Sequence, residues 1–250
     1  MKAYLLSVII AAKDPPETQF VRCLASFSAL AQVHRIQLVL VESGEPLLVT
    51  AESVSQFANV KRLRVPAEGV YSAYNAGIDV AEGTYLLFFG ADDIALPGMD
   101  SVIEHLDATA AAYHLYAATC YMQASGLLNP SARRLSLIRA NWCHQGIFYL
   151  RDYLSNHRYE ARYQMQADHK LNIDIVSNKQ LRFGVSQTTV AYFSAGGISS
   201  MSPDLVFRKD FPSIVAVAYG QPWGWLVRVK QILVDFLVGP PEKRFVPHDK

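Results

Sequence analysis

Residues 85–93 read Tyr-Leu-Leu-Phe-Phe-Gly-Ala-Asp-Asp, an apolar run that ends in two small residues and two adjacent carboxylates. A short continuous apolar run bounded by a turn signal is typical of a strand buried on both faces of a sheet. A second turn signal, Pro97-Gly98, follows it. The stretch therefore predicts a buried strand over residues 85–89, with Asp92 and Asp93 just beyond its carboxyl end.

Strands and helices alternate on the amino-terminal side of this stretch. Apolar runs at residues 4–12, 37–41 and 60–65 have the length of short strands, and apolar residues recur at helical spacing over 20–30 and 71–81. This alternation predicts an α/β fold with a mostly parallel sheet and helices on both faces. Ligands of such sheets bind beyond the carboxyl ends of the strands.

The later part of the chain is less regular. Weaker apolar runs at residues 115–122, 146–150, 180–183 and 189–193 predict further strands of the same domain. The composition shifts after Phe211, where a strongly apolar segment begins. We therefore expect one domain over residues 1–211 and a helical tail over 212–250.

Composition argues against several classes of protein. The formal net charge of the 250 residues is +1, which predicts no nucleic-acid partner because such binding needs a strongly basic face. The three scattered cysteines cannot form a disulfide framework and favour a reducing cytosol. The apolar start could be a secretory signal, but its β-branched residues and its sharp end at Asp14-Pro15-Pro16 favour a buried strand.

Asp92 and Asp93 are open to two interpretations from the local residues alone. Hard oxygen ligands at a strand end suit Mg²⁺ or Mn²⁺ shared with phosphates. Aspartate is equally common as the N-cap of a helix, and a helix is expected to begin near Pro97.

A set of short motifs extends the pattern along most of the chain. They are Ser7–Ile10, Val39–Gly44, Gly69–Ile78, Ala81–Tyr85, Ala91–Asp93, His144–Tyr149, Tyr163–Asn172 and Phe193–Ser199. In order and spacing this set resembles the family 2 glycosyltransferases over residues 5–200, and it is most similar to bacterial members from surface-polysaccharide clusters of the colanic acid type.

The resemblance implies a GT-A fold and an inverting transfer from a nucleoside diphosphate sugar, with UDP favoured. The acceptor it implies is a saccharide or a lipid-linked acceptor in polysaccharide biosynthesis. It divides the domain into a nucleotide-sugar half, 1–100, and an acceptor half, 101–211. The implied location is the cytoplasm, with the inner face of the membrane as a possible site of action.

The resemblance also implies residues for the donor side. The family's Asp-x-Asp site falls at Gly90-Ala91-Asp92, so the metal role of Mg²⁺ or Mn²⁺ is placed on Asp92 with Asp93, and glycine at the first position leaves metal dependence open. Glu42 stands where the family has an aspartate that contacts the nucleoside. The nucleotide-binding residues that it implies are Ala12, Glu42, Ser72, Asn75, Ala91 and Asp92.

On the acceptor side, the resemblance places the general base at Asp168. This residue matches the second acid of the family's Glu-Asp pattern, with Ala167 in place of the first. A base is needed because the attacking hydroxyl must lose its proton. From the residues alone, Asp168 also fits an N-cap of the helix that follows. His144 and Gln145 are expected in the acceptor or sugar pocket, with a packed core histidine as the alternative.

The tail carries an amphipathic pattern. Its apolar stripe consists of Trp225, Leu226, Val229, Ile232, Leu233, Phe236 and Leu237, opposite Arg228, Gln231 and Asp235. Such a stripe docks on its own domain, on a second subunit of a homo-oligomer, or on a membrane surface.

Three other functions compete with a transferase. The replaced acids at Gly90 and Ala167 support a non-catalytic nucleotide-sugar-binding relative, whereas the presence of Asp92 and Asp168 opposes it. An NAD-dependent oxidoreductase is rejected, because no Gly-x-Gly-x-x-Gly follows the first strand. A nucleotidyltransferase is a distant option, because no glycine-rich basic phosphate loop is found there.

Overall fold

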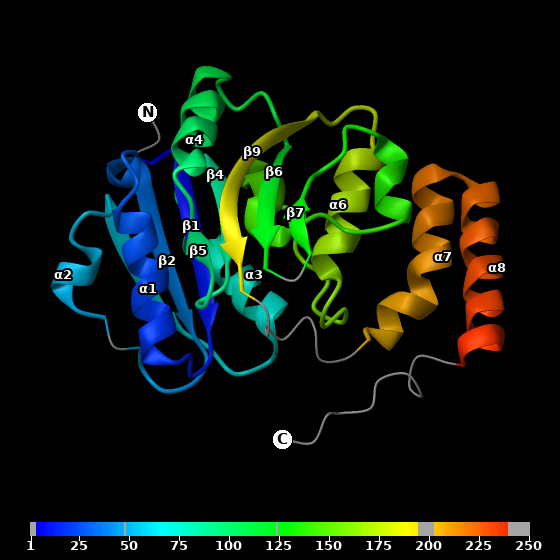
Figure 1. The fold of residues 1–250 in the computed structure, drawn as a ribbon, viewed down its shortest axis with the longest axis horizontal. Coiled ribbons are helices and arrows are strands. Elements are labelled where there is room, and N and C mark those ends of the chain that lie inside the picture. Colours follow the sequence, from blue (N-terminus) through cyan, green and yellow to red (C-terminus); the bar gives the residue numbers. More distant parts are fainter. Residues whose placement is uncertain (1–3, 48, 124, 195–202, 240–250) are drawn as a thin grey trace.

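The computed structural model describes residues 4–47, 49–123, 125–194 and 203–239, and its core is one curled sheet covered by helices (Figure 1). The strands are β1 (Leu6–Ala12), β2 (Ile36–Glu42), β3 (Asn59–Arg64), β4 (Tyr85–Phe89), β5 (Ile94–Ala95), β6 (Leu115–Met122), β7 (Gly126–Leu128), β8 (Ile147–Leu150) and β9 (Phe183–Phe193). The order in the sheet is β3-β2-β1-β4-β8-β6-β9-β5, and β7 pairs with β6.

The helices alternate with these strands, as expected for the first half of the chain. They are α1 (Glu17–Ser28), α2 (Ala51–Val54), α3 (Val70–Val80), α4 (Gly98–Ala108), α5 (Arg151–Leu154), α6 (Ala167–Ser177), α7 (Leu205–Tyr219) and α8 (Gln221–Val238), with short 3-10 turns η1 (Val33–Arg35), η2 (Arg134–Ile138) and η3 (His144–Gly146).

The first four strands confirm the predicted parallel sheet. β1 lies between β2 and β4 and is parallel to both, with Ala12 opposite Glu42 and Ile10 opposite Phe89. Successive side chains of a strand point to opposite faces. Val8 and Ile10 accordingly pack in one core with residues of α1 and α4, and Ile9 packs in a second core with residues of α3 and α6. Burial on both faces explains why these strands are continuous apolar runs.

The second half makes the sheet mixed. β8 is antiparallel to both β4 and β6, whereas β6 and β9 are parallel. The apolar runs at 180–183 and 189–193 were expected to be separate strands, but β9 is one strand from Phe183 to Phe193. Polar residues interrupt its middle, where Gln187 is exposed and the register with β6 shifts. The irregular pairing accounts for the broken apolar pattern.

The predicted boundary of the tail, between residues 211 and 212, falls inside α7. The helix begins earlier because Asp204 caps it, its carboxylate accepting a hydrogen bond of 2.9 Å from the N–H of Phe207. Phe207 and Phe211 then pack against His169 of α6. α7 and α8 lie side by side at one end of the molecule, with α8 outermost (Figure 1). The division of the chain into a domain and a tail stays a prediction.

Gly83 supplies a test of this packing. A side chain here would collide with β1, because its Cβ would lie 2.4 Å from the Ser7 nitrogen and 2.7 Å from the Leu6 carbonyl carbon. The Gly83 N–H also donates to the Ser7 hydroxyl at 2.8 Å. We expect Gly83→Ala to lower the free energy of unfolding by about 1–3 kcal/mol, as overpacking does. Urea unfolding measures this as a lower midpoint at constant m, and an unchanged midpoint would contradict the close approach.

Candidate functional site

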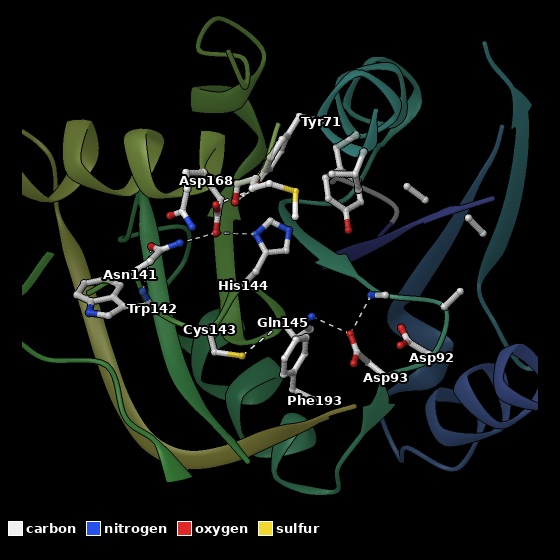
Figure 2. A pocket seen from close by; sticks show the side chains of 18 of the residues that line it. Tyr71, Asp92, Asp93, Asn141, Trp142, Cys143, His144, Gln145, Asp168 and Phe193 are labelled. Atoms are coloured by element: carbon white, nitrogen blue, oxygen red, sulfur yellow. Dashed lines mark hydrogen bonds and ion pairs between the residues drawn. The ribbon is translucent and has the colours of Figure 1, made fainter. Parts of the chain in front are cut away.

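A cavity of about 1050 Å³ opens beyond the carboxyl ends of β1 and β4. From β1 the chain passes to β2 on one side, and β4 later returns to its other side, so the cavity lies at a switch in strand order. Its walls come from distant segments: residues 11–16 at the end of β1 and just beyond it, the first turns of α3, residues 90–93 after β4, residues 140–145, and the start of α6. Figure 2 shows the side chains that line it.

Asp93 is held by the protein itself. Its Oδ2 accepts hydrogen bonds from the Gln145 side chain at 2.7 Å and from the Gly90 N–H at 3.2 Å, and its Oδ1 accepts one from the Ser194 N–H at 3.0 Å. Burial raises the pKa of Asp93 to about 6, and the Ser194 hydrogen bond opposes that rise. Three of the four lone-pair sites of this carboxylate are thus occupied by structural donors.

Asp92 differs from its neighbour. It is half-buried and lines the cavity, and within the described part of the chain its carboxylate forms no hydrogen bond. Its backbone carbonyl, by contrast, accepts from the Ser194 hydroxyl at 2.8 Å, which fixes the turn. The capping interpretation of both aspartates is wrong, because the N-cap of α4 is Pro97 and no side chain caps it. Of the two aspartates, Asp92 is therefore the one whose carboxylate has no partner among the described residues.

Asp168 is held by side chains from two other segments of the chain. Its Oδ1 accepts a hydrogen bond from the Tyr71 hydroxyl at 2.7 Å, and its Oδ2 accepts one from the Asn141 side chain at 2.6 Å. The predicted alternative, an N-cap, is wrong: Gln166 is the N-cap of α6 and Asp168 lies in the first turn. Its side chain points instead into the cavity wall toward Asn141, Tyr71 and His144 (Figure 2).

His144 completes this cluster. Its Nδ1 lies 3.5 Å from Asp168 Oδ2, an ion-pair distance that is too long for a strong hydrogen bond, and its Nε2 has no partner within the described residues. The ring stacks on Tyr74 with centroids 5.4 Å apart. Burial alone would raise the pKa of Asp168, but contact with His144 and the Tyr71 hydrogen bond outweigh it and lower that pKa. Asp168 therefore stays ionised although it is buried.

The structure brings together most, but not all, of the residues expected at the site. Those that line the cavity are Ala12, Ala91, Asp92, Asp93, His144, Gln145 and Asp168. Glu42, Ser72 and Asn75 do not. The Glu42 carboxylate accepts a hydrogen bond of 2.7 Å from Arg62 of the neighbouring β3, and the Asn75 side chain bonds the backbone of Tyr159. The nucleotide-binding roles expected of these three residues stay predictions.

Tyr71 and Asn141 were missed by the sequence analysis. Tyr71 opens α3 and meets Asp168 from a position 97 residues earlier in the chain. Asn141 is itself fixed, because its Oδ1 accepts from the Trp142 N–H and from Asn172 of α6. The only signal that could have identified Asn141 is its place three residues before the His144-Gln145 pair.

Charge in the cavity is unbalanced. Asp14, Asp92, Asp93 and Asp168 line it, whereas Lys13 is the single lysine or arginine among the described lining residues. The described residues contain no cluster of three or more His, Cys, Asp or Glu side chains that could hold a metal by themselves. An anionic ligand would therefore meet a lining in which acidic side chains outnumber basic ones.

Comparison with known proteins gives one consistent result. The model of glycosyl transferase family 2 matches residues 7–187. Glycosyltransferases of PGL/p-HBAD biosynthesis from Mycobacterium tuberculosis and Mycobacterium bovis are 33% identical over 196 residues, which cover 70% of this chain and 72% of theirs.

Solved structures agree in fold. Staphylococcus aureus TarS 1-349 in complex with UDP superposes with a TM-score of 0.65 at 11% identity, over 93% of this chain and 72% of TarS 1-349. The complex of the same protein with UDP-GlcNAc gives a TM-score of 0.62 at 14% identity, over 93% and 71% of the two chains.

Proposed function

Because this chain belongs to glycosyl transferase family 2 and is therefore a sugar-transferring enzyme, we propose that it moves the sugar of a UDP-sugar, with inversion, to a saccharide or lipid-linked acceptor. One observation carries the proposal: the carboxylate of Asp92, which has no partner among the described residues, and the ionised carboxylate of Asp168 line one cavity at the switch in strand order. Figure 2 shows them on opposite sides of that cavity, with His144 and Gln145 between them. A donor diphosphate near Asp92 leaves room for an acceptor near Asp168.

The donor side rests on the end of β1 and on the turn after β4. Ala12 and Ala91 line the cavity with little side chain, which leaves space for a nucleoside. The first turn of α3 also faces the cavity, and the free N–H groups of a helix start favour an anion. The UDP and UDP-GlcNAc complexes of the similarly folded TarS support a UDP-sugar as the donor class.

A divalent cation fits the donor side. Mg²⁺ and Mn²⁺ bind through one or two carboxylates together with phosphate oxygens. Asp92 offers one such carboxylate, and acidic residues outnumber basic ones in the lining of its cavity. Asp93 is the weaker candidate, because Gln145, Gly90 and Ser194 already occupy most of its lone pairs. When bound, the cation would neutralise charge on the departing diphosphate.

The acceptor side supplies the base. The acceptor hydroxyl oxygen forms a bond to the anomeric carbon while the bond from that carbon to the diphosphate oxygen breaks, and the hydroxyl proton passes to Asp168. Oδ1 of Asp168 accepts one hydrogen bond, from Tyr71, so a lone pair is left for this proton. Tyr71 and Asn141 act as positioning residues, since they fix the carboxylate that takes the proton.

The lowered pKa of Asp168 leads to a prediction about pH. A base with a depressed pKa stays ionised down to low pH, so protonation of Asp168 should contribute no acid limb to kcat/KM between pH 7 and about pH 5; any limb near pH 6 would belong to Asp93. His144→Phe keeps a ring against Tyr74 but removes the nitrogen near Asp168, and the pKa of Asp168 should then rise. We expect the acid limb of this variant to move to higher pH. An unchanged profile would argue against Asp168 as the titrating base.

The transfer itself is tested by release of UDP. Purified protein is incubated with UDP-GlcNAc and other UDP-sugars, with Mn²⁺, and with a panel of saccharide and lipid-linked acceptors. Acceptor-dependent release of UDP with a glycosylated product supports the proposal. Binding of UDP without release from any donor would favour a non-catalytic relative.

A further inference from the structure

The outermost helix, α8, has two unlike faces. Its inner face packs on α7 through Gly224 and Val227, and a Cβ on Gly224 would lie 2.5 Å from the Ala216 Cβ. The same face carries Gln231, which donates to the Arg208 carbonyl at 3.0 Å, and Asp235, which pairs with the Arg208 side chain at 2.7 Å. Two of the polar residues expected opposite the apolar stripe, Gln231 and Asp235, therefore anchor α8 to its own chain.

The outer face is the apolar stripe, defined as Trp225, Leu226, Val229, Ile232, Leu233, Phe236 and Leu237. Apart from the half-buried Val229, these side chains are between 50% and 85% exposed. At 100° per residue, the stripe spans an arc of about 140°, from Ile232 to Leu237, without a polar residue. A continuous apolar face of this size on a surface helix marks a binding surface.

Basic residues border the stripe on both edges. Arg228 was expected opposite the stripe, but on the helical projection it lies beside Ile232. Lys230 lies beside Leu237, and both basic residues are exposed. Neither forms an ion pair within the described residues. The acidic side chains of α7 and α8, by contrast, form ion pairs with the protein itself. Asp210 pairs with Arg162, and Asp235 pairs with Arg208.

A groove continues this surface beside Lys230. It has a volume of about 370 Å³ and lies between η2 and the two helices. Arg139 and Lys230 contribute its charge, and Trp223, Leu226 and Phe211 contribute its apolar wall. The combination of apolar wall and cations suits an anionic group attached to a hydrocarbon.

We propose that the stripe of α8 lies in the surface of an anionic lipid bilayer. Lysines and arginines at the edges of an apolar helix face, with tryptophan on it, are the features of helices that lie at the membrane interface. A second copy of this chain would fit less well, because a two-fold contact through the stripe would bring the basic edges of the two copies together, and the stripe itself carries no acidic side chain. None of the helices in the described part of the chain is long and apolar enough to cross a bilayer.

The proposal is independent of sugar transfer and is tested by binding alone. The full chain is mixed with vesicles of phosphatidylcholine, with and without 30% phosphatidylglycerol, and bound protein is measured by flotation. We expect binding to the anionic vesicles that weakens in high salt. Phe236→Glu should lower the partition coefficient by about tenfold or more, since it removes a membrane-facing ring and adds an opposing charge. Joint replacement of Arg228 and Lys230 by glutamine should lower it by a similar factor.

Val21→Glu is the matched control. Val21 is 46% exposed on α1, at the opposite end of the molecule, so the same type of change should leave vesicle binding intact (Figure 1). Two results would overturn the proposal. One is absence of wild-type binding to anionic vesicles. The other is a dimer in light scattering without lipid that Phe236→Glu converts to monomer, which would assign the stripe to a second copy.

Discussion

Replacing Asp168 by asparagine should lower kcat for sugar transfer by about 10²–10⁴-fold, the usual contribution of a general base. The amide keeps the shape of the carboxylate but cannot take the acceptor's proton. The amide oxygen can still accept the hydrogen bond from Asn141, and its NH₂ group then faces the Tyr71 hydroxyl, which can donate to the Met165 carbonyl at 3.2 Å. Affinity for UDP should stay within about twofold, because the donor side does not depend on this proton transfer.

Asp174→Asn is the matched control for this variant. Asp174 lies on the same helix, α6, and pairs with Lys170 at 2.6 Å instead of facing the cavity. Transfer by this variant should match that of the wild type. If Asp168→Asn retained a tenth or more of the wild-type kcat, the base would have to be another group. His144, whose Nε2 has no partner in the described part of the chain, would be the first to examine.

Replacing Asp92 by alanine should lower kcat/KM by about a hundredfold or more, because stabilisation of the leaving diphosphate is lost. The fold should be preserved, since the Asp92 carboxylate forms no hydrogen bond in the described structure and its backbone carbonyl still accepts from Ser194. Activity is measured over a Mn²⁺ titration. The expected result is a loss that added metal does not restore.

Asp107→Ala serves as its control. This variant removes one carboxylate and changes the net charge equally, but Asp107 is exposed on α4 and pairs with Arg35. Its activity and its metal response should be those of the wild type. Full activity of Asp92→Ala would mean either that Asp93 binds the metal or that sugar transfer does not depend on a metal at these two aspartates.

The sequence predicted the parts of the fold whose cause is local. β1, β2 and β4 are buried on both faces, so their apolar runs identify them without further information. β9 was divided in two because its polar middle lies at a register shift with β6, which only the pairing shows. The stripe of α8 followed from periodicity, but periodicity does not say which face meets the protein. Gly224, which lets α8 approach α7 closely, determines that.

The candidate site, like the fold, was predicted only where the signal is local in the sequence. Asp92, Asp93 and Asp168 stand in motifs, and the cavity contains all three. The partners that set their different roles come from elsewhere in the chain: Gln145 for Asp93, and Tyr71 and Asn141 for Asp168. Glu42 was expected to face the nucleoside, yet its carboxylate bonds Arg62 of the adjacent strand. Contacts between distant segments of this kind have no signature in a single sequence.

Nucleotide binding by the wild-type chain is the measurement to make first. Thermal unfolding is followed with UDP, GDP and dTDP, each with and without Mn²⁺. If the cavity is a UDP-sugar site with a cation on Asp92, UDP and Mn²⁺ together should stabilise the fold by roughly 2.7 kcal/mol at about 100 times Kd, and UDP alone should do less. If none of the three nucleotides stabilised the fold, with or without metal, the cavity would not be a nucleotide-sugar site.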